Sequence, residues 1–228
     1  MEFLNKYRKL RKKVKTVKVE ICTDKPTVNK IIEAAIPLFA TKGVASVSVK
    51  ELADAAGVNI ALISYYFGGK ENLYAYILEK QLSILGDAID IISKEDISAI
   101  MKIRRFADNL VVIHKKNPYI DRLFYIEIFN PTKYFDTIVK TAANRMHFFL
   151  SNCIKDAVTS GEFRPDIDPQ LAAMSLLRVL NVSLTSHSLC RELLPDREDL
   201  ARQYVAQAVE IYLNGVTNSV KISRDEEK

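Results

Sequence analysis

The sequence predicts an all-α protein, and three observations support that fold class. Only seven glycines and seven prolines occur among the 228 residues, so the chain has few of the turn clusters that separate strands. No segment shows the strict alternation of apolar and polar residues that is typical of a strand. Apolar residues instead recur at intervals of three and four, most clearly at Leu78, Leu82, Leu85, Ile89 and Ile92. Long helices are therefore the expected units of the fold.

The boundaries of these helices follow from the apolar spacing and from glycine or proline residues between the segments. We expect helices over residues 27–42, 48–55, 59–66, 69–92, 96–115, 119–129, 133–160, 168–189 and 196–217. The breaks between the later helices coincide with Pro118, Pro131, Gly161, Pro165, Pro169 and Pro195. Pro37 falls inside the first helix, where it removes a backbone donor and crowds the carbonyl group of Glu33, so we expect a kink there.

Composition excludes several classes of protein. At 228 residues and 48% hydrophobic content, the chain can form one large or two small domains with a core of their own. Charged residues make up 27%, and no apolar run approaches the roughly 20 residues that a membrane-spanning helix needs. Cys22, Cys153 and Cys190 are far apart and odd in number, which fits neither a disulfide framework nor a CxxC motif. Lys15 and Lys18 interrupt the apolar stretch that a signal peptide would require, so we expect a cytoplasmic protein.

The positive charge of the chain is concentrated at its start. Residues 1–25 contain nine basic and three acidic residues, a net charge of +6, whereas the whole chain carries +5 and the remainder therefore −1. We interpret this stretch as a basic N-terminal extension that is attracted to a polyanion, such as nucleic acid or an anionic membrane surface. A solvated tail without a partner is the alternative.

Residues 48–73, SVKELADAAGVNIALISYYFGGKENL, have the pattern of two helices joined by a tight turn. Ser48 and Glu51 have the spacing of a capping box, in which each side chain bonds the backbone amide of the other residue. Gly57 lies where the turn needs positive φ, and Asn59 is suited to cap the second helix. That helix is expected to expose four residues to a major groove: Ile60, Ala61, Ser64 and Tyr65. Two packed helices in an ordinary helical protein remain the alternative.

Three consecutive segments resemble the TetR (tetracycline-repressor-like) family of transcriptional regulators. They are IIEAAIPLFATKG (31–43), VSVKELADAAGVN (47–59) and ALISYYFGGKENLY (61–74), and they cover about 45 residues. The resemblance implies an N-terminal three-helix helix-turn-helix DNA-binding domain over residues 26–72 and a larger C-terminal helical domain, for ligand binding and dimerisation, over residues 73–228. It further implies a sequence-specific regulator, a repressor released by a small-molecule effector.

The resemblance also implies the DNA-contacting residues: Ser48, Lys50, Asn59, Ile60, Ala61, Ser64, Tyr65, Tyr66 and Lys70. Among them, Lys70 and Tyr66 would contact phosphates, Lys70 with the help of a helix N-terminus. Ile60 and Ala61 cannot read hydrogen-bonding edges, so they would touch bases through thymine methyl groups. Residues 26–80 carry five basic and five acidic residues, so the non-specific affinity of this head for DNA would be weak. The basic extension could supply the missing positive charge.

The rest of the chain carries no catalytic signature. The histidines are far apart, and GxSxG, GxGxxG and P-loop motifs are absent from the sequence, so we expect no enzyme, no metal and no cofactor. By the family resemblance the aromatic residues between 106 and 149 enclose an effector site, with Asn144 as a possible further polar anchor. The candidate residues are Phe106, His114, Phe124, Tyr125, Phe129, Arg145 and Phe149. Ordinary core packing is the alternative for each of them.

The last two helices are apolar over a wide arc. In the final helix one stripe contains Leu200, Tyr204, Ala208 and Ile211, and a neighbouring stripe contains Val205, Val209, Tyr212 and Val216. The resemblance implies that one face meets a second copy, giving a homodimer that binds a near-palindromic double-stranded DNA operator. A final helix buried within a monomer is the alternative. For the whole chain, the competing interpretation is an all-helical ligand-binding or adaptor protein without DNA binding.

Overall fold

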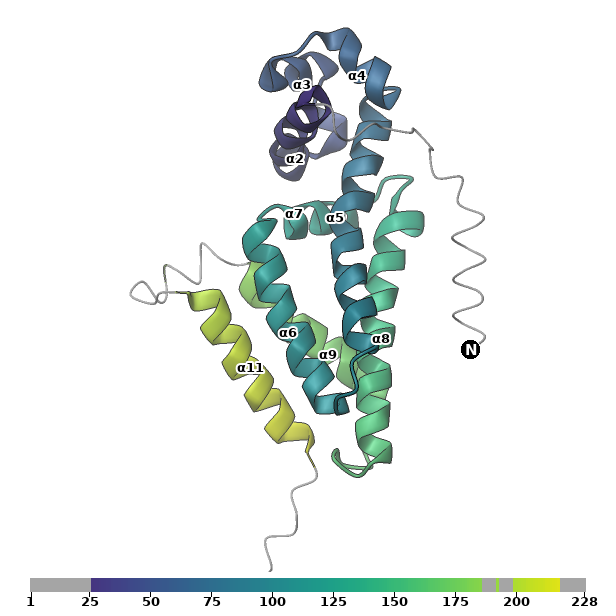
Figure 1. Ribbon diagram of the computed structural model, residues 1–228, viewed down its shortest axis with the longest axis vertical. Helices are drawn as coiled ribbons and strands as arrows, with labels where there is room; N and C mark the ends of the chain where they lie inside the picture. The colour runs from purple at the N-terminus through teal and green to yellow at the C-terminus, as the bar shows by residue number, and fades with distance from the viewer. Residues whose placement is uncertain (1–25, 186–191, 193–198, 218–228) are drawn as a thin grey trace, which may run out of the picture. The chain divides into compact units, whose positions relative to one another are not determined.

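The computed structural model describes residues 26–185, 192 and 199–217, and every regular element in these ranges is helical. In chain order the elements are α2 (Pro26–Ser46), α3 (Val49–Ala56), α4 (Ile60–Phe67), α5 (Lys70–Ser93), α6 (Ala99–Lys116), α7 (Ile120–Phe129), the π-helical turn η1 (Phe135–Val139), α8 (Lys140–Thr159), α9 (Pro169–Thr185) and α11 (Leu200–Val216) (Figure 1). The all-α fold class is thereby confirmed. The basic extension, Cys22, Cys190 and the expected helix residues 186–189 and 196–198 lie outside the described residues.

The interruption in α2 does not lie where the sequence predicts it. The residue with non-helical backbone angles inside this helix is Gly43, at φ 72° and ψ 159°, and not Pro37. Helical geometry continues through Pro37, and the hydroxyl of Thr41 donates to the Pro37 carbonyl oxygen at 2.7 Å. Glu33 is exposed, so water can solvate the carbonyl group that the proline leaves without a backbone donor. The prediction of a kink at Pro37 is therefore wrong, because the interruption lies at Gly43.

Local caps define both helices of the turn motif. Ser48 is the N-cap of α3, and its hydroxyl accepts from the Glu51 amide at 3.0 Å. Gly57 ends α3 in the left-handed region, at φ 62° and ψ 39°, a conformation that costs glycine little. Asn59 caps α4 by accepting from the Ala61 amide at 2.9 Å. The Glu51 carboxylate also binds Lys42 of α2 at 2.5 Å, and the Ser48 backbone is a further hydrogen-bond partner of this carboxylate.

The first of two compact units contains α2, α3, α4, the start of α5 as far as Gln81, and residues 122–140. Its core includes Phe39 of α2, Ile63 and Phe67 of α4, and Tyr74 of α5. The unit is larger than the expected domain of residues 26–72. The reason is visible at Tyr74, whose ring packs edge-on against Phe39 at 5.1 Å and whose hydroxyl binds residue 127 of α7.

The second unit comprises residues 82–121 and the described residues from 141 to 217. In it α11 packs against α6 and α9, and the helices meet through buried aliphatic and aromatic side chains. Phe163, which follows α8, forms an isolated antiparallel bridge with Thr217 just after α11. Among the described residues, no helix combines the length and the apolar character needed to cross a bilayer.

Candidate nucleic-acid interface

The exposed face of α4 is the main feature of the first unit. Ile60 and Tyr65 are 49% and 72% exposed, and Ala61 and Ser64 beside them are also exposed. On the opposite side of the same helix, Ile63 and Phe67 are almost completely buried. Because the exposed residues are spaced by one, three and one positions, they form a single face two turns long. We call Ile60, Ala61, Ser64 and Tyr65 the α4 face.

The side chains of α4 offer few kinds of polar group. Its sequence, IALISYYF, contains no charged and no amide side chain, so its hydrogen-bonding side chains are the three hydroxyls of Ser64, Tyr65 and Tyr66. The rings of Tyr65 and Tyr66 meet edge-to-face, with centroids 5.0 Å apart. The carbonyl oxygen of the Asn59 side chain, directly before the helix, is already engaged in the cap. The α4 face is therefore an apolar surface with a few hydroxyl groups.

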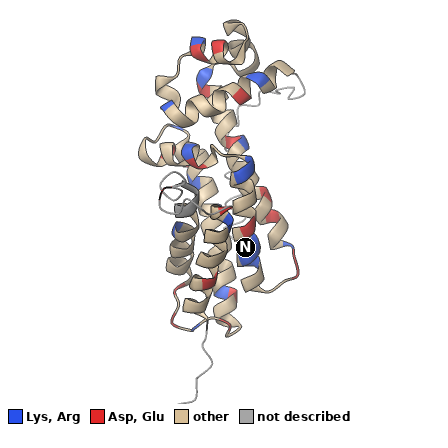
Figure 2. Ribbon diagram, turned by 90° about the vertical axis from the view of Figure 1, so that its left-hand side faces the viewer, with Lys and Arg blue, Asp and Glu red and all other residues tan. Residues whose placement is uncertain are grey.

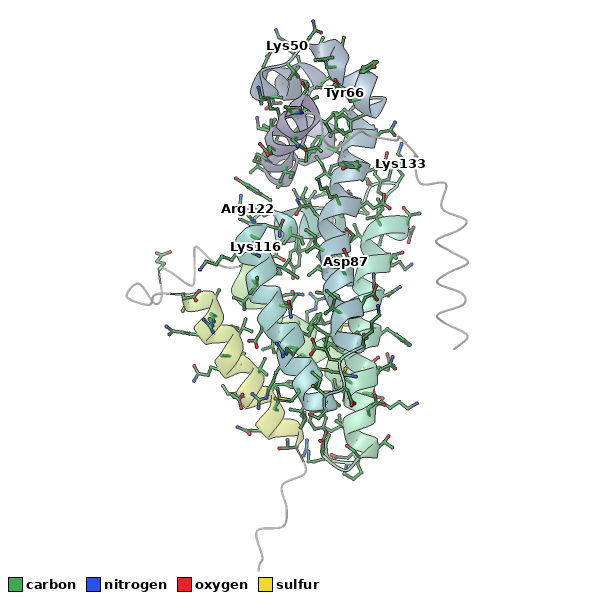
Figure 3. The ribbon with its side chains drawn as sticks, in the orientation of Figure 1. Lys50, Tyr66, Asp87, Lys116, Arg122 and Lys133 are labelled. Atoms are coloured by element: carbon green, nitrogen blue, oxygen red, sulfur yellow. The ribbon has the colours of Figure 1, made fainter. Side chains whose placement is uncertain are left out.

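The flanking segments provide cationic and polar groups. Ser48 and Lys50, at the start of α3, are exposed, and Figure 3 shows Lys50 projecting outward. Lys70 begins α5 and donates through Nζ to the Val47 carbonyl oxygen at 2.8 Å, which ties the start of α5 to the start of α3. An ammonium group has three donors, so Lys70 keeps two for another acceptor. Of the nine predicted DNA-contacting residues, seven are exposed, and Tyr66 and Lys70 are half-buried.

Acidic groups offset most of this charge. Lys42 pairs with Glu51, and this ion pair and hydrogen bond hold the pKa of the Glu51 carboxyl below its usual value. In Figure 2 the helices of the first unit carry Lys and Arg interspersed with Asp and Glu. The head therefore lacks the continuous basic surface of a protein that binds DNA through charge alone.

The predicted effector residues divide between the two units. Phe124, Tyr125 and Phe129 belong to the first unit, where Tyr125 stacks against the exposed Phe129 with centroids 6.2 Å apart. Tyr125 and Phe129 line a shallow groove of about 390 Å³ between α2 and α7, together with Ala40, Thr41, Arg122, Ile126 and Asn130. Phe124 meets the edge of Tyr125 at 5.7 Å.

The other four effector candidates lie in the second unit and have partners there. Phe106 and Phe149 are buried against each other, with centroids 5.5 Å apart. His114 places Nδ1 2.6 Å from the Leu110 carbonyl oxygen and Nε2 2.6 Å from Asp121 Oδ1. The Arg145 guanidinium binds Asp90 of α5 and lies over Gly86, where a Cβ atom would collide with it. Asn144, in contrast, is exposed.

One buried polar cluster was missed from the sequence. Glu127 is fully buried and accepts hydrogen bonds from the Tyr74 hydroxyl at 2.7 Å and from the Thr132 amide and hydroxyl at 3.2 and 3.1 Å. Burial, followed by the bond to Glu127, raises the pKa of Tyr74. A lone carboxylate inside the apolar run LFYIEIF was the signal that could have revealed it. The cluster joins α5 to α7 and to the segment after it.

The all-α fold, the capped turn and the α4 face together define a helix-turn-helix protein. Residues 31–77 match the sequence profile of the family described as bacterial regulatory proteins, tetR family. Over these residues the chain is therefore similar to the DNA-binding domain of the TetR family.

Two curated relatives and two solved structures illustrate the similarity. A probable HTH-type transcriptional regulator, YttP of Bacillus subtilis (strain 168), is 48% identical over 54 residues, which cover 24% of this chain and 26% of the relative. The HTH-type transcriptional repressor SCO4008 of Streptomyces coelicolor is 32% identical over 101 residues, 44% of this chain and 49% of the relative. These matches thus span about a quarter and about half of the relatives' lengths.

Among solved structures, the TetR family transcriptional regulator PfmR of Thermus thermophilus superposes with a TM-score of 0.67 at 25% identity, covering 82% of this chain and 99% of that one. The ketosteroid transcriptional regulator KstR2 of Mycobacterium tuberculosis gives a TM-score of 0.69 at 18% identity, covering 86% and 96%. The shared fold thus extends well beyond the matched N-terminal residues.

Proposed function

We propose that this protein is a sequence-specific DNA-binding transcriptional regulator that inserts α4 into the major groove. The observation that carries the proposal is the α4 face, an exposed row backed by the buried Ile63 and Phe67 and fixed by the caps at Asn59 and Gly68. A rigid helix of this kind fits the width of the major groove. Similarity to DNA-binding regulators over residues 31–77 supports the same proposal.

The residues around α4 are proposed to fix its register on the duplex. Ser48 and Lys50 at the start of α3, and Lys70 at the start of α5, would contact phosphates on either side of the groove. The amides at the N-terminus of α5 favour an anion at the same place. Because the charge of the head is balanced, the basic extension of residues 1–25 is proposed to add further phosphate contacts.

The regulator is proposed to act in the cytoplasm as a homodimer through α9 and α11. Ile211 of α11 and Leu171 and Met174 of α9 are exposed, although both helices also bury apolar residues within the unit. A second copy that packs on this exposed face would form a four-helix bundle. The dimer would present two copies of α4 about 34 Å apart, so the proposed operator is near-palindromic.

A small-molecule effector that releases the DNA is a further part of the proposal, and it rests on the similarity to the family. Phe106 and Phe149 are proposed as part of its apolar surroundings. Linkage requires such an effector to bind the free dimer more tightly than the DNA-bound dimer. Calorimetric titration of both forms with a candidate effector tests this point, and equal affinities would exclude that compound as an inducer.

Selection of bound fragments from sheared genomic DNA tests DNA recognition itself. The full-length protein should enrich a small set of fragments that share a near-palindromic sequence, and footprinting should protect both half-sites. An all-helical ligand-binding or adaptor protein would enrich no common sequence. That outcome would reject the proposal in favour of the alternative.

A further inference from the structure

The composition of the α4 face limits how it can read DNA. Specific readout of guanine relies chiefly on Arg or Lys, and readout of adenine on Asn or Gln, because these side chains form paired hydrogen bonds with a base edge. None of these residue types occurs between Ile60 and Phe67. The hydroxyls of Ser64 and Tyr65 can form single hydrogen bonds but not the paired bonds that identify one base.

Three polar residues near α4 already have partners within the described part of the chain. Asn59 uses its side-chain oxygen to cap the Ala61 amide, and a flipped amide would lose that cap. Lys70 is held on the Val47 carbonyl oxygen, beyond the end of α4. Lys42 is paired with Glu51. The groups that α4 itself brings to a base pair are therefore the aliphatic Ile60 and Ala61 and the ring of Tyr65.

We infer that the operator is recognised mainly through the C5-methyl groups of thymines that contact Ile60, Ala61 and Tyr65. The inference rests on the proposed function and specifies the chemistry of its target. The thymine methyl is the apolar group that the major groove presents, and aliphatic side chains are its usual partners. Burying the exposed Ile60 against such a methyl removes apolar surface from water on both sides of the contact.

The length of the α4 face sets the size of the thymine cluster. From Ile60 to Tyr65 the helix advances five residues, or about 7.5 Å at a rise of about 1.5 Å per residue. Successive base pairs are about 3.4 Å apart, so this row spans about two base steps. Each half-site is expected to contain two or three neighbouring A·T pairs whose thymines face α4.

Substitution of deoxyuridine for thymidine tests the inference, because it removes the methyl group and leaves every hydrogen-bonding edge unchanged. The probe is the operator obtained by genomic selection, with each thymine replaced in turn in both half-sites, and affinity is measured by fluorescence anisotropy at fixed salt. At one or two positions per half-site we expect a loss of about fourfold per methyl, or about fifteenfold for the symmetric pair, given the usual contribution of one buried carbon group.

Two further arms assign the effect to the methyl group and to α4. Replacing a critical T·A pair by C·G should weaken binding, and 5-methylcytosine at that position should restore part of it, because its methyl occupies the same place in the groove. At one of the critical positions, the Ile60→Ala variant should have nearly the same affinity for the operator with thymine as for the operator with uracil. The Lys50→Ala variant is the matched control, and it should lose affinity for both operators by the same factor.

The outcomes separate this inference from the proposed function. If the protein discriminates its operator but uracil substitution has no effect, and 7-deazaguanine weakens binding instead, guanine edges are read and the inference is overturned while the regulator remains. If the protein binds no sequence preferentially, both the proposed function and the inference fail. The inference would also be overturned if uracil substitution lowered the affinity by the same factor in the wild-type protein and in variants at Ile60, Ala61 and Tyr65.

Discussion

At the scale of single residues, Tyr74 and Glu127 form a buried polar contact in the first unit. The Glu127 carboxylate is buried and depends on hydrogen bonds from Tyr74 and Thr132 to offset its loss of solvation. Tyr74 lies one turn after Lys70, for which we propose a phosphate contact. The cluster therefore helps to fix α7 and the start of α5 in one unit.

The Tyr74→Phe variant should lower the free energy of unfolding by about 1.5–3 kcal/mol, because it removes one donor from a buried charged acceptor without creating a cavity. Urea titration followed by circular dichroism measures the change. Tyr65→Phe removes the hydroxyl of an exposed tyrosine and is the matched control, for which we expect a change within about 0.5 kcal/mol. If the two variants had the same free energy of unfolding, the Tyr74–Glu127 hydrogen bond would not contribute to stability.

Cys153 makes stability depend on pH in the alkaline range. Burial raises the pKa of its thiol from 9.0 to about 11. Below pH 9 the thiol is protonated in both states and has no effect; above pH 9 the unfolded chain loses a proton that the folded protein retains, which favours unfolding. Relative to pH 8, this group should remove about 1.4 kcal/mol of stability at pH 10.

Comparison with Cys153→Ala isolates that contribution, because Tyr212, whose pKa burial raises to about 12, is present in both proteins. The alanine variant is expected to be less stable at pH 8 but to lose about 1.4 kcal/mol less between pH 8 and pH 10. Parallel pH profiles for the two proteins would contradict the assignment.

At the scale of elements, the sequence predicts what depends on local contacts. The caps at Ser48 and Asn59 and the left-handed Gly57 were all predictable, since each involves groups two to four residues apart. The further contact of the Glu51 carboxylate with Lys42 of α2 was not predictable in this way. Contacts between helices cannot be deduced from spacing along one helix. The break in α2 was misplaced because the helix continues through Pro37 and leaves helical geometry at Gly43, a residue that adopts positive φ at little cost.

Substitutions of Asn59 separate its role as a cap from its proposed proximity to DNA. Asn59→Ala should lower the free energy of unfolding by about 1 kcal/mol, because the Ala61 amide loses its acceptor. Asn59→Asp keeps an acceptor and should leave stability within about 0.5 kcal/mol, yet it should weaken operator binding because it places a negative charge near phosphates. Chemical unfolding and anisotropy titration measure the two effects. Full operator affinity in the aspartate variant would place Asn59 away from the DNA.

At the scale of the whole molecule, the fold class and nearly all helix positions were predictable, but the division into units was not. Residues 122–140 join the first unit through Tyr74 and Glu127, which are 53 positions apart in the chain. The effector candidates were selected as aromatic or polar residues in one stretch, and composition alone cannot distinguish a pocket from a core. Phe106 and Phe149 are in fact buried together, and Arg145 is bound to Asp90.

The proposed dimer predicts the effect of a charge on the exposed part of α11. Ile211 is 67% exposed, and Ile211→Glu should raise the dimer dissociation constant by about a hundredfold or more, because each symmetric interface would bury two unpaired carboxylates. Sedimentation equilibrium measures this constant. Ile91→Glu is the matched control, since Ile91 of α5 is 64% exposed, and this variant should leave the dimer unchanged. A wild-type protein that sediments as a monomer would contradict the interface.

The central claim is that the α4 face distinguishes one DNA sequence from others, and the affinity ratio between the selected operator and a scrambled duplex tests it most directly. Anisotropy titrations at one salt concentration should give a ratio of about 10³ or more for the wild-type protein. In the Ala61→Glu variant the ratio should fall close to one, because on the proposed docking the new carboxylate would face the bases, while the exposed position of Ala61 leaves the fold intact. A wild-type ratio near one, or an unchanged ratio in a folded Ala61→Glu variant, would contradict the account.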